Sequence, residues 1–214
     1  MTKAETLDML LDSAIECFSK FGYQGASLRE IARNASVTLS TIHFYFASKA
    51  ELYTAARRYA WGQIDDERHA LLSDAEGRSG DVSLEQLVYC LANPVVRRAL
   101  SPEPRDRALV FVIRSNMTFA SSSETGSMFH LADRTASRWV DGIIACCPGL
   151  SREDGFWAFS YMISAVYSWQ LVDHRYDHMI GAERGRSIDT VCKDIVAFCS
   201  GGIREIEKKR KSER

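Results

Sequence analysis

The chain has 214 residues, of which 46% are apolar and 26% charged, which is ordinary globular composition and excludes disorder over most of its length. Its 27 basic and 28 acidic residues give a formal charge of −1, so a nucleic-acid site has to be a local patch rather than a property of the whole protein. Only 4 prolines interrupt the chain, and its long proline-free stretches favour helices over a β-sandwich.

The cysteines and apolar segments indicate a cytoplasmic protein with no membrane span. Six cysteines are present without a Cys-x-x-Cys pair, and five lie within apolar helical patterns, as expected of thiols in a reducing compartment. The N-terminus lacks the apolar block of a secretory signal. The least charged stretch, 155–172, is slightly short for a membrane span and contains several serines, so we expect a buried helix there.

The first predicted element is an amphipathic helix. Apolar residues with the spacing of one helical face are Leu7, Leu10, Leu11, Ala14, Ile15, Phe18 and Phe21. Thr2 and Glu5 have the spacing of a capping box before this helix, and Gly22 is a suitable C-terminal stop.

Two very short helices and a longer one should follow. Ser27 with Glu30 repeats the capping-box spacing and opens the first short helix, and Thr38 is a plausible N-cap for the second, which runs through residue 44. Ser48 with Glu51 opens a helix that we expect to run to about residue 73. Because short helices are unstable alone, the two must pack on each other and on the first helix.

The rest of the chain predicts further helices. Residues 74–82 are polar and contain glycine, which indicates a loop. Beyond it we expect helices from Ser83 to before Pro94 or near residue 100, over 105–120, over 127–147, over 151–174, and from Ser187 to 206, with a basic tail at 207–214. The prediction is an all-α fold of about nine helices.

Residues 27–46 have the pattern of a helix-turn-helix. Core positions Leu28, Ile31, Ala32, Val37 and Ile42 fix a helix, a tight turn and a second helix, the arrangement in which the second helix enters the DNA major groove. The outward positions of that second helix are Thr38, Leu39, Ser40, Thr41, His43 and Phe44, which suit phosphate hydrogen bonds and thymine methyl contacts. The alternative on spacing alone is a generic pair of short core helices.

The segment FGYQGASLREIARNASVTLSTIHFYFASKAELYTAA resembles the N-terminal domain of the TetR family of bacterial transcriptional repressors. The residues that carry the resemblance are Phe18, Gly22, Tyr23, Ala26, Ser27, Ile31, Ala32, Ala35, Val37, Thr38, Thr41, Ile42, Tyr45, Phe46, Lys49 and Leu52. The family's turn glycine is Ser36 here, and its frequent tyrosine within the second short helix is His43.

The resemblance implies a homodimer with a helix-turn-helix domain at 1–50, a connecting helix at 51–74, and a ligand-binding and dimerisation domain at 83–206. It implies DNA backbone contacts from Ser27, Thr41, His43, Tyr45 and Lys49, and base-edge contacts from Arg29, Leu39, Ser40 and Phe44. The expected function is a ligand-responsive regulator that binds a double-stranded DNA operator and is released from it by a small-molecule effector.

Helices 151–174 and 187–206 are the candidate dimer elements. They are long and last in the chain, and Ser160, Ser164 and Ser168 form a small-residue face suited to close helix contact. A helix hairpin buried within one subunit is the alternative.

The effector site is expected among residues 105–180, which hold 11 of the 22 aromatic residues. Arg114 lies in an apolar helix and therefore needs a partner, either an internal acid such as Asp141 or an anionic ligand. The candidate ligand-binding residues are Phe111, Arg114, Met117, Thr118, Trp139 and Gln170, although most aromatic residues in this region are expected to be core.

Other chemistry is weakly supported. His174 and His178 have the spacing of a helical metal pair but lie among polar residues, so a solvated face is preferred. The acidic run 65–67 is not accompanied by a motif for a metal or a catalytic base, so we expect these residues on the protein surface. We find no catalytic or cofactor-binding motif, and therefore predict no enzyme, no cofactor and no metal site. The competing classes are an all-α enzyme or carrier for a small apolar molecule and a helical protein-binding adaptor.

Overall fold

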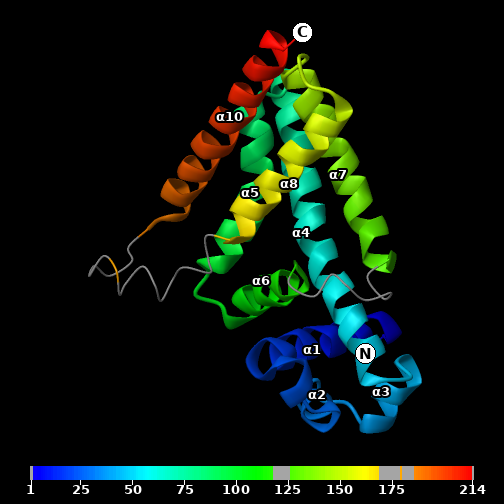
Figure 1. The fold of residues 1–214 in the computed structure, drawn as a ribbon. Helices are drawn as coiled ribbons and strands as arrows, with labels where there is room; N and C mark the ends of the chain where they lie inside the picture. The colour runs from blue at the N-terminus through cyan, green and yellow to red at the C-terminus, as the bar shows by residue number, and fades with distance from the viewer. Residues whose placement is uncertain (1, 118–125, 169–178, 180–185, 214) are drawn as a thin grey trace. The chain divides into compact units, whose positions relative to one another are not determined.

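The computed structural model describes residues 2–117, 126–168, 179 and 186–213, and within these ranges it has nine α-helices and no strand (Figure 1). The helices are α1 Lys3–Gly25, α2 Leu28–Asn34, α3 Leu39–Tyr45, α4 Lys49–Ser79, α5 Leu84–Ala99, α6 Pro104–Met117, α7 Gly126–Cys146, α8 Arg152–Ser168 and α10 Ile188–Ser212. The predicted all-α fold is confirmed.

Most of the predicted helix starts are confirmed, because serine and threonine hydroxyls accept hydrogen bonds from unpaired N–H groups of the first turn. Thr2 with Glu5 and Ser83 with Gln86 form complete capping boxes. Ser187 caps α10 by accepting from the N–H of Thr190. The capping box predicted at Ser27 is wrong, since Ser27 makes no side-chain cap hydrogen bond at the start of α2.

The helix α4 is longer than the sequence predicted, and the loop expected at 74–82 begins only after Ser79. An ion pair between Asp74 and Arg78, one turn apart on the exposed face, stabilises this polar end of the helix. The helix is followed by Gly80, whose φ of 73° is a left-handed conformation that glycine adopts without steric cost. Similarly, α5 continues through Pro94 to Ala99, the longer of the two predicted lengths.

The described chain divides into two compact units, and α4 contributes to both. The first unit comprises Met1–Gln63 and Ser101–Met128. Its core is made by apolar residues of α1, α2, α3 and α4, among them Leu10, Phe18, Ile31, Ile42 and Leu52, each at most 2% exposed. The hydroxyl of Ser13 on α1 donates to the carbonyl of Ile31 on α2 at 2.9 Å, which fixes these two helices against each other.

The second unit comprises Ile64–Leu100 and Phe129–Arg214. Here α5 packs against α8 and α10, and Val88, Leu91, Val95, Trp139 and Val166 are completely buried. No helix among the described residues is long and apolar enough to cross a membrane.

Candidate DNA-binding surface and effector groove

A tight turn sets the geometry between α2 and α3. Ser36 has a φ of 54°, the left-handed conformation that the family pattern gives to glycine, and the N–H of Val37 donates to the carbonyl of Ala32 at 2.9 Å. Thr38 then caps α3 by accepting from the N–H of Thr41 at 3.1 Å. The turn therefore supplies the reversal that a helix-turn-helix requires.

The helix α3 has one buried side and one exposed side. Ile42 is 1% exposed and holds the helix on the core, whereas Ser40, His43 and Phe44 are exposed. Phe44 is 72% exposed, so most of its ring is available for contact with another molecule. Leu39 and Thr41 are half-buried at the edge of this face.

The residues flanking α3 are held by contacts between distant parts of the sequence. The ammonium of Lys49 donates to the carbonyl of Gln24 at 3.2 Å and lies 4.9 Å from the ring centre of Tyr23. The hydroxyl of Tyr45 donates to the carbonyl of Lys3 at 3.2 Å. Two of the expected backbone contacts are therefore also used to fix the ends of α1 in the absence of DNA.

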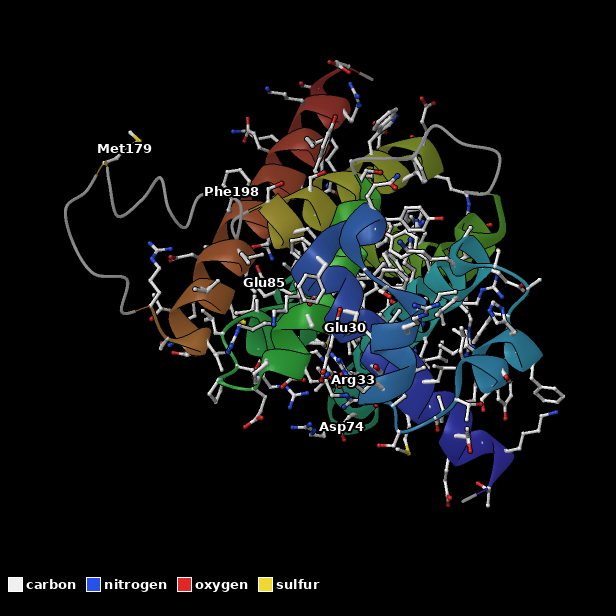
Figure 2. All side chains as sticks on the ribbon, turned by 90° about the horizontal axis from the view of Figure 1, so that it is seen from below. Glu30, Arg33, Asp74, Glu85, Met179 and Phe198 are labelled. Atoms are coloured by element: carbon white, nitrogen blue, oxygen red, sulfur yellow. The ribbon has the colours of Figure 1, made fainter. Side chains whose placement is uncertain are left out.

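The remaining predicted DNA contacts lie on α2 and at its start. Ser27 and Arg29 are exposed, and Arg29 lies in the first turn of α2. Glu30 and Arg33 form an ion pair at 3.5 Å on the same short helix, and both residues are labelled in Figure 2. Because one of the local basic residues is neutralised by this acid, the positive charge near α3 comes from few residues, among them Arg29 and Lys49.

The predicted effector residues are only partly described. The side chains of Arg114 and Met117, and residues Thr118, Gln170, His174 and His178, lie outside the described residues. Trp139 is completely buried and its ring N–H donates to the carbonyl of Leu87 at 3.0 Å. Phe111 on α6 is 39% exposed. Asp141 is exposed and pairs with Arg152 at 2.7 Å, so it is not an internal acid, and the partner of Arg114 stays a prediction.

The second unit contains a mainly apolar groove of about 650 Å³ between α4, α5 and α10. Its lining residues are Leu71, Ala75, Arg78, Glu85, Gln86, Tyr89, Cys90, Asp189, Lys193, Val196, Ala197 and Ser200. No sequence pattern predicted this groove, because its residues come from three helices whose exposed faces carry no common motif. A second hollow of about 780 Å³, between α4, α5, α7 and α10, is more polar and includes Glu76, Arg138 and Arg204.

The charged residues along the groove are paired with opposite charges. Arg78 pairs with Asp74, Glu85 with Arg204, and Lys193 with Asp189 at 2.7 Å. Burial raises the pKa of the Cys90 thiol to about 11, so Cys90 is an uncharged, weakly polar part of the wall at neutral pH. The groove is thus apolar and close to electrically neutral.

A buried polar cluster joins four helices of the second unit. Arg68 on α4 is 0% exposed, and its guanidinium donates to the carbonyl of Leu91, to Asp65 at 3.1 Å and to the hydroxyl of Tyr167 at 3.3 Å. Asp65 also accepts from the hydroxyl of Thr135 on α7 at 2.9 Å. The expectation that the acidic run 65–67 is surface is therefore wrong for Asp65. Glu67 is also engaged, with Arg97 at 2.6 Å.

The helices α8 and α10 expose large apolar side chains. Phe156, Trp157 and Tyr161 on α8 are each more than 50% exposed, and the ring of Trp157 lies against those of the other two. On α10, Phe198 is 76% exposed, and Figure 2 labels it on that helix. Gly201 and Gly202 follow on α10, and a side chain added at either would meet no atom within 4 Å. An apolar surface of this kind indicates contact with another protein surface.

The helix-turn-helix on an all-α body defines the protein as a DNA-binding regulator. The family model for bacterial regulatory proteins of the tetR family matches residues 10–56, and the model for the tetracyclin repressor-like C-terminal domain matches residues 89–202, more than half of the chain. The chain belongs to the tetR family and is a ligand-responsive, DNA-binding transcriptional regulator. The family is one of regulators and is generally non-enzymatic.

Individual relatives agree with this assignment. The transcriptional repressor KstR of Mycobacterium tuberculosis is 25% identical over 152 residues, which cover 64% of this chain and 68% of that protein. The regulator RutR of Escherichia coli is 41% identical over 49 residues, which cover 23% of each chain. In fold, the chain is similar to the fatty acid degradation regulator FadR from Bacillus halodurans, with a TM-score of 0.64, 16% identity and coverage of 88% and 97% of the two chains.

Proposed function

We propose that the protein is a dimeric repressor that binds a pseudo-palindromic operator through α2, the turn and α3 and leaves it when an effector binds the C-terminal helices. The exposed face of α3, with Phe44 beside Ser40 and His43, is the observation that carries the DNA-binding assignment. We retain Ser27, Thr41, His43, Tyr45 and Lys49 as proposed backbone contacts, and Arg29, Thr38, Leu39, Ser40 and Phe44 as the rest of the proposed surface.

The domain assignment follows the same proposal. Residues 1–50 would bind DNA, and residues 83–206 would bind the effector and dimerise. Residues 51–74 would connect these two domains. The continuous helix α4 supports a coupling between these parts, because it runs from the cap after α3 to the groove residues Leu71 and Ala75. An effector that shifts α4 would change the spacing of the two helix-turn-helix motifs and so their fit to adjacent major grooves.

The DNA-binding assignment can be tested by fluorescence anisotropy with duplex DNA from upstream of the protein's own gene. We expect tight, salt-dependent binding by the wild type, because phosphate contacts dominate affinity. Leu39→Ala should change the preference among operator variants, since Leu39 lies at the edge of the exposed face of α3. Ser137→Ala, at an exposed serine of α7, is the control for a change away from this surface. Unchanged preference in Leu39→Ala would remove Leu39 from the reading surface.

For the effector we propose a largely apolar, uncharged molecule bound in the groove of α4, α5 and α10. The volume of the groove is in the usual range of ligand sites. The charged side chains along the groove are already paired with each other, so an ionic ligand would gain little there. Tyr89 offers a polar contact: its hydroxyl accepts from the amide of Asn93 at 3.0 Å and can donate its own O–H to a ligand acceptor. The set Phe111, Arg114, Met117, Thr118, Trp139 and Gln170 remains the alternative, and it would suit an anionic ligand.

Two dyes can separate the two effector sites. Nile red, which is neutral and apolar, should bind the wild type saturably and bind Ala75→Trp weakly, because the new side chain fills the groove. Ala145→Trp, which fills the second hollow, is the matched control. Anilinonaphthalene sulfonate is anionic and should be sensitive to Arg114→Met if the alternative site is correct. Equal Nile red binding by wild type and Ala75→Trp would contradict the groove assignment.

A further inference from the structure

The first turn of α1 lies against the end of α3. The carbonyl of Lys3 accepts the hydroxyl of Tyr45 at 3.2 Å, across 42 residues of sequence. The ammonium of Lys3 lies 5.3 Å from the ring centre of Phe44 and 5.9 Å from that of Tyr45. Two independent contacts, one from the backbone and one from the side chain, therefore place Lys3 beside the exposed face of α3.

The charge of Lys3 is not paired with an acid within the described part of the protein. None of the ion pairs among the described residues includes Lys3, whereas Lys193, Arg105 and Arg210 each face a carboxylate. The nearest acid in sequence, Glu5, accepts the backbone N–H of Thr2 at 2.8 Å and completes the capping box of α1. Lys3 is also exposed, so its ammonium remains hydrated and can contact an anion.

The aromatic faces below Lys3 restrict where that ammonium can lie. A cation over an aromatic ring is attracted by the electron density of the ring face, and here two rings act on one side chain. Phe44 and Tyr45 are in edge-to-face contact, with their ring centres 5.1 Å apart, so the two rings form one aromatic surface. Lys3 is thereby held close to the side chains proposed to read DNA.

We infer that Lys3 is a further DNA contact, whose ammonium binds a backbone phosphate at the edge of the major groove that α3 enters. The inference rests on the proposed function, because it requires α3 to enter that groove. A helix in the major groove is flanked by phosphates, and residues beside its exposed face are placed to reach them. No motif near Lys3 in the sequence indicates this role, since Lys3 precedes the helix-turn-helix by more than twenty residues.

A purely structural role for Lys3 would give a different result from a phosphate contact. If Lys3 only supports Phe44, its replacement should change the preference among sequences and leave the salt dependence as it was. If it binds a phosphate, its replacement should weaken binding to all sequences about equally and lower the magnitude of the salt slope by about 0.9 for each lost contact. A symmetric dimer would lose two contacts.

The chain offers a matched control at the other end of the same helix. Lys20 lies over the ring of Phe21 at 5.1 Å, so it is also a lysine of α1 in cation–aromatic contact, but it has no contact with α3 among those described. The experiment measures operator binding by wild type, Lys3→Gln, Lys3→Arg and Lys20→Gln at four salt concentrations. Circular dichroism should first establish that each variant is folded.

We expect Lys3→Gln to lose about tenfold or more in affinity at low salt and to give a shallower slope, Lys3→Arg to retain both, and Lys20→Gln to match the wild type. A wild-type slope in Lys3→Gln would overturn the inference even if its affinity fell. A wild type that shows no specific DNA binding would instead contradict the proposed function, so the two failures can be told apart.

Discussion

The turn between α2 and α3 holds Ser36 in a backbone conformation that serine does not favour. Its φ of 54° is unfavourable for a residue with a Cβ atom, at a cost on the order of 1–2 kcal/mol. The hydrogen bonds of Ala35 and Val37 to the end of α2 hold the turn in this conformation. The position is exposed, so the cost is not offset by burial.

Ser36→Gly should therefore stabilise the protein. Glycine adopts the left-handed conformation freely, and its greater freedom in the unfolded chain removes part of the gain, which leaves a net effect of about 0.5–1 kcal/mol. Denaturant unfolding followed by circular dichroism measures it. Ser40→Gly, within α3, is the contrasting variant and should destabilise. A lower midpoint for Ser36→Gly than for the wild type would mean that the turn is not strained.

Features that depend on neighbouring residues were predictable from the sequence, whereas side chains whose partners come from distant helices were not. The tight turn before Val37 and the cap at Thr38 were predicted, because each depends on neighbours within a few residues. Arg68 was missed, because its partners Leu91 and Tyr167 come from other helices and nothing near it in sequence marks its burial. Lys3 was missed for the same reason. Long-range contacts of polar side chains leave little local trace in a sequence.

At the scale of elements, α4 and α7 are joined by a directed chain of hydrogen bonds. Arg138 can only donate, so the Nδ1 atom of His69 must accept at 2.8 Å, and its Nε2–H then donates to the hydroxyl of Thr135 at 3.0 Å. That hydroxyl in turn donates to Asp65. The arrangement requires a neutral His69, because a proton on Nδ1 would face the guanidinium of Arg138.

The pKa of His69 is correspondingly lowered, first by burial and then by Arg138, with a smaller part from Arg134. Asp65 and Asp66 on α4 act in the opposite direction but do not outweigh these effects. The folded protein thus binds this proton less readily than the unfolded chain, and the contribution of neutral His69 to stability is present above the ordinary histidine pKa and lost as the pH falls below it.

We therefore expect the wild type to lose thermal stability between about pH 7 and pH 5, because protonation of His69 breaks its contact with Arg138. His69→Gln should be less stable at pH 7 but show a weaker pH dependence over this range. His43→Gln, which removes an exposed imidazole of α3, is the control. The measurement is the melting temperature by circular dichroism as a function of pH. An equal pH dependence in His69→Gln and wild type would exclude His69 as the responsible group.

The elements themselves were largely predictable from the sequence. Capping residues and apolar periodicity located most helix starts, as at Thr2, Ser83 and Ser187. The end of α4 was not predictable, because residues 74–79 are polar and contain glycine. Their helical conformation depends on the ion pair of Arg78 with Asp74 and on the ion pair of Glu76 with Arg138 of α7 at 2.7 Å. A contact from another helix overrode the local preference for a loop.

At the scale of the whole molecule, the exposed apolar face of α8 and α10 is the feature that a monomer does not explain. Phe156, Trp157 and Tyr161 lie on α8 with Ser164 one turn further along, and Phe198 lies on α10. Two copies of this face would form an isologous four-helix contact, in which the serine and glycine positions allow the helices to approach closely. The proposed dimer uses these two helices.

Ser164→Arg should disrupt this dimer, because it places an unpaired charge in a close, water-poor helix contact. Operator affinity should then fall by about a hundredfold or more, since each monomer would bind one half-site without the second site to retain it. Sedimentation velocity measures the assembly, and anisotropy measures the affinity. Ser137→Arg, at an exposed serine of α7, should leave both unchanged. A folded Ser164→Arg protein that still sediments as a dimer would place the interface elsewhere, and the exposed aromatic residues of α8 would then need another partner.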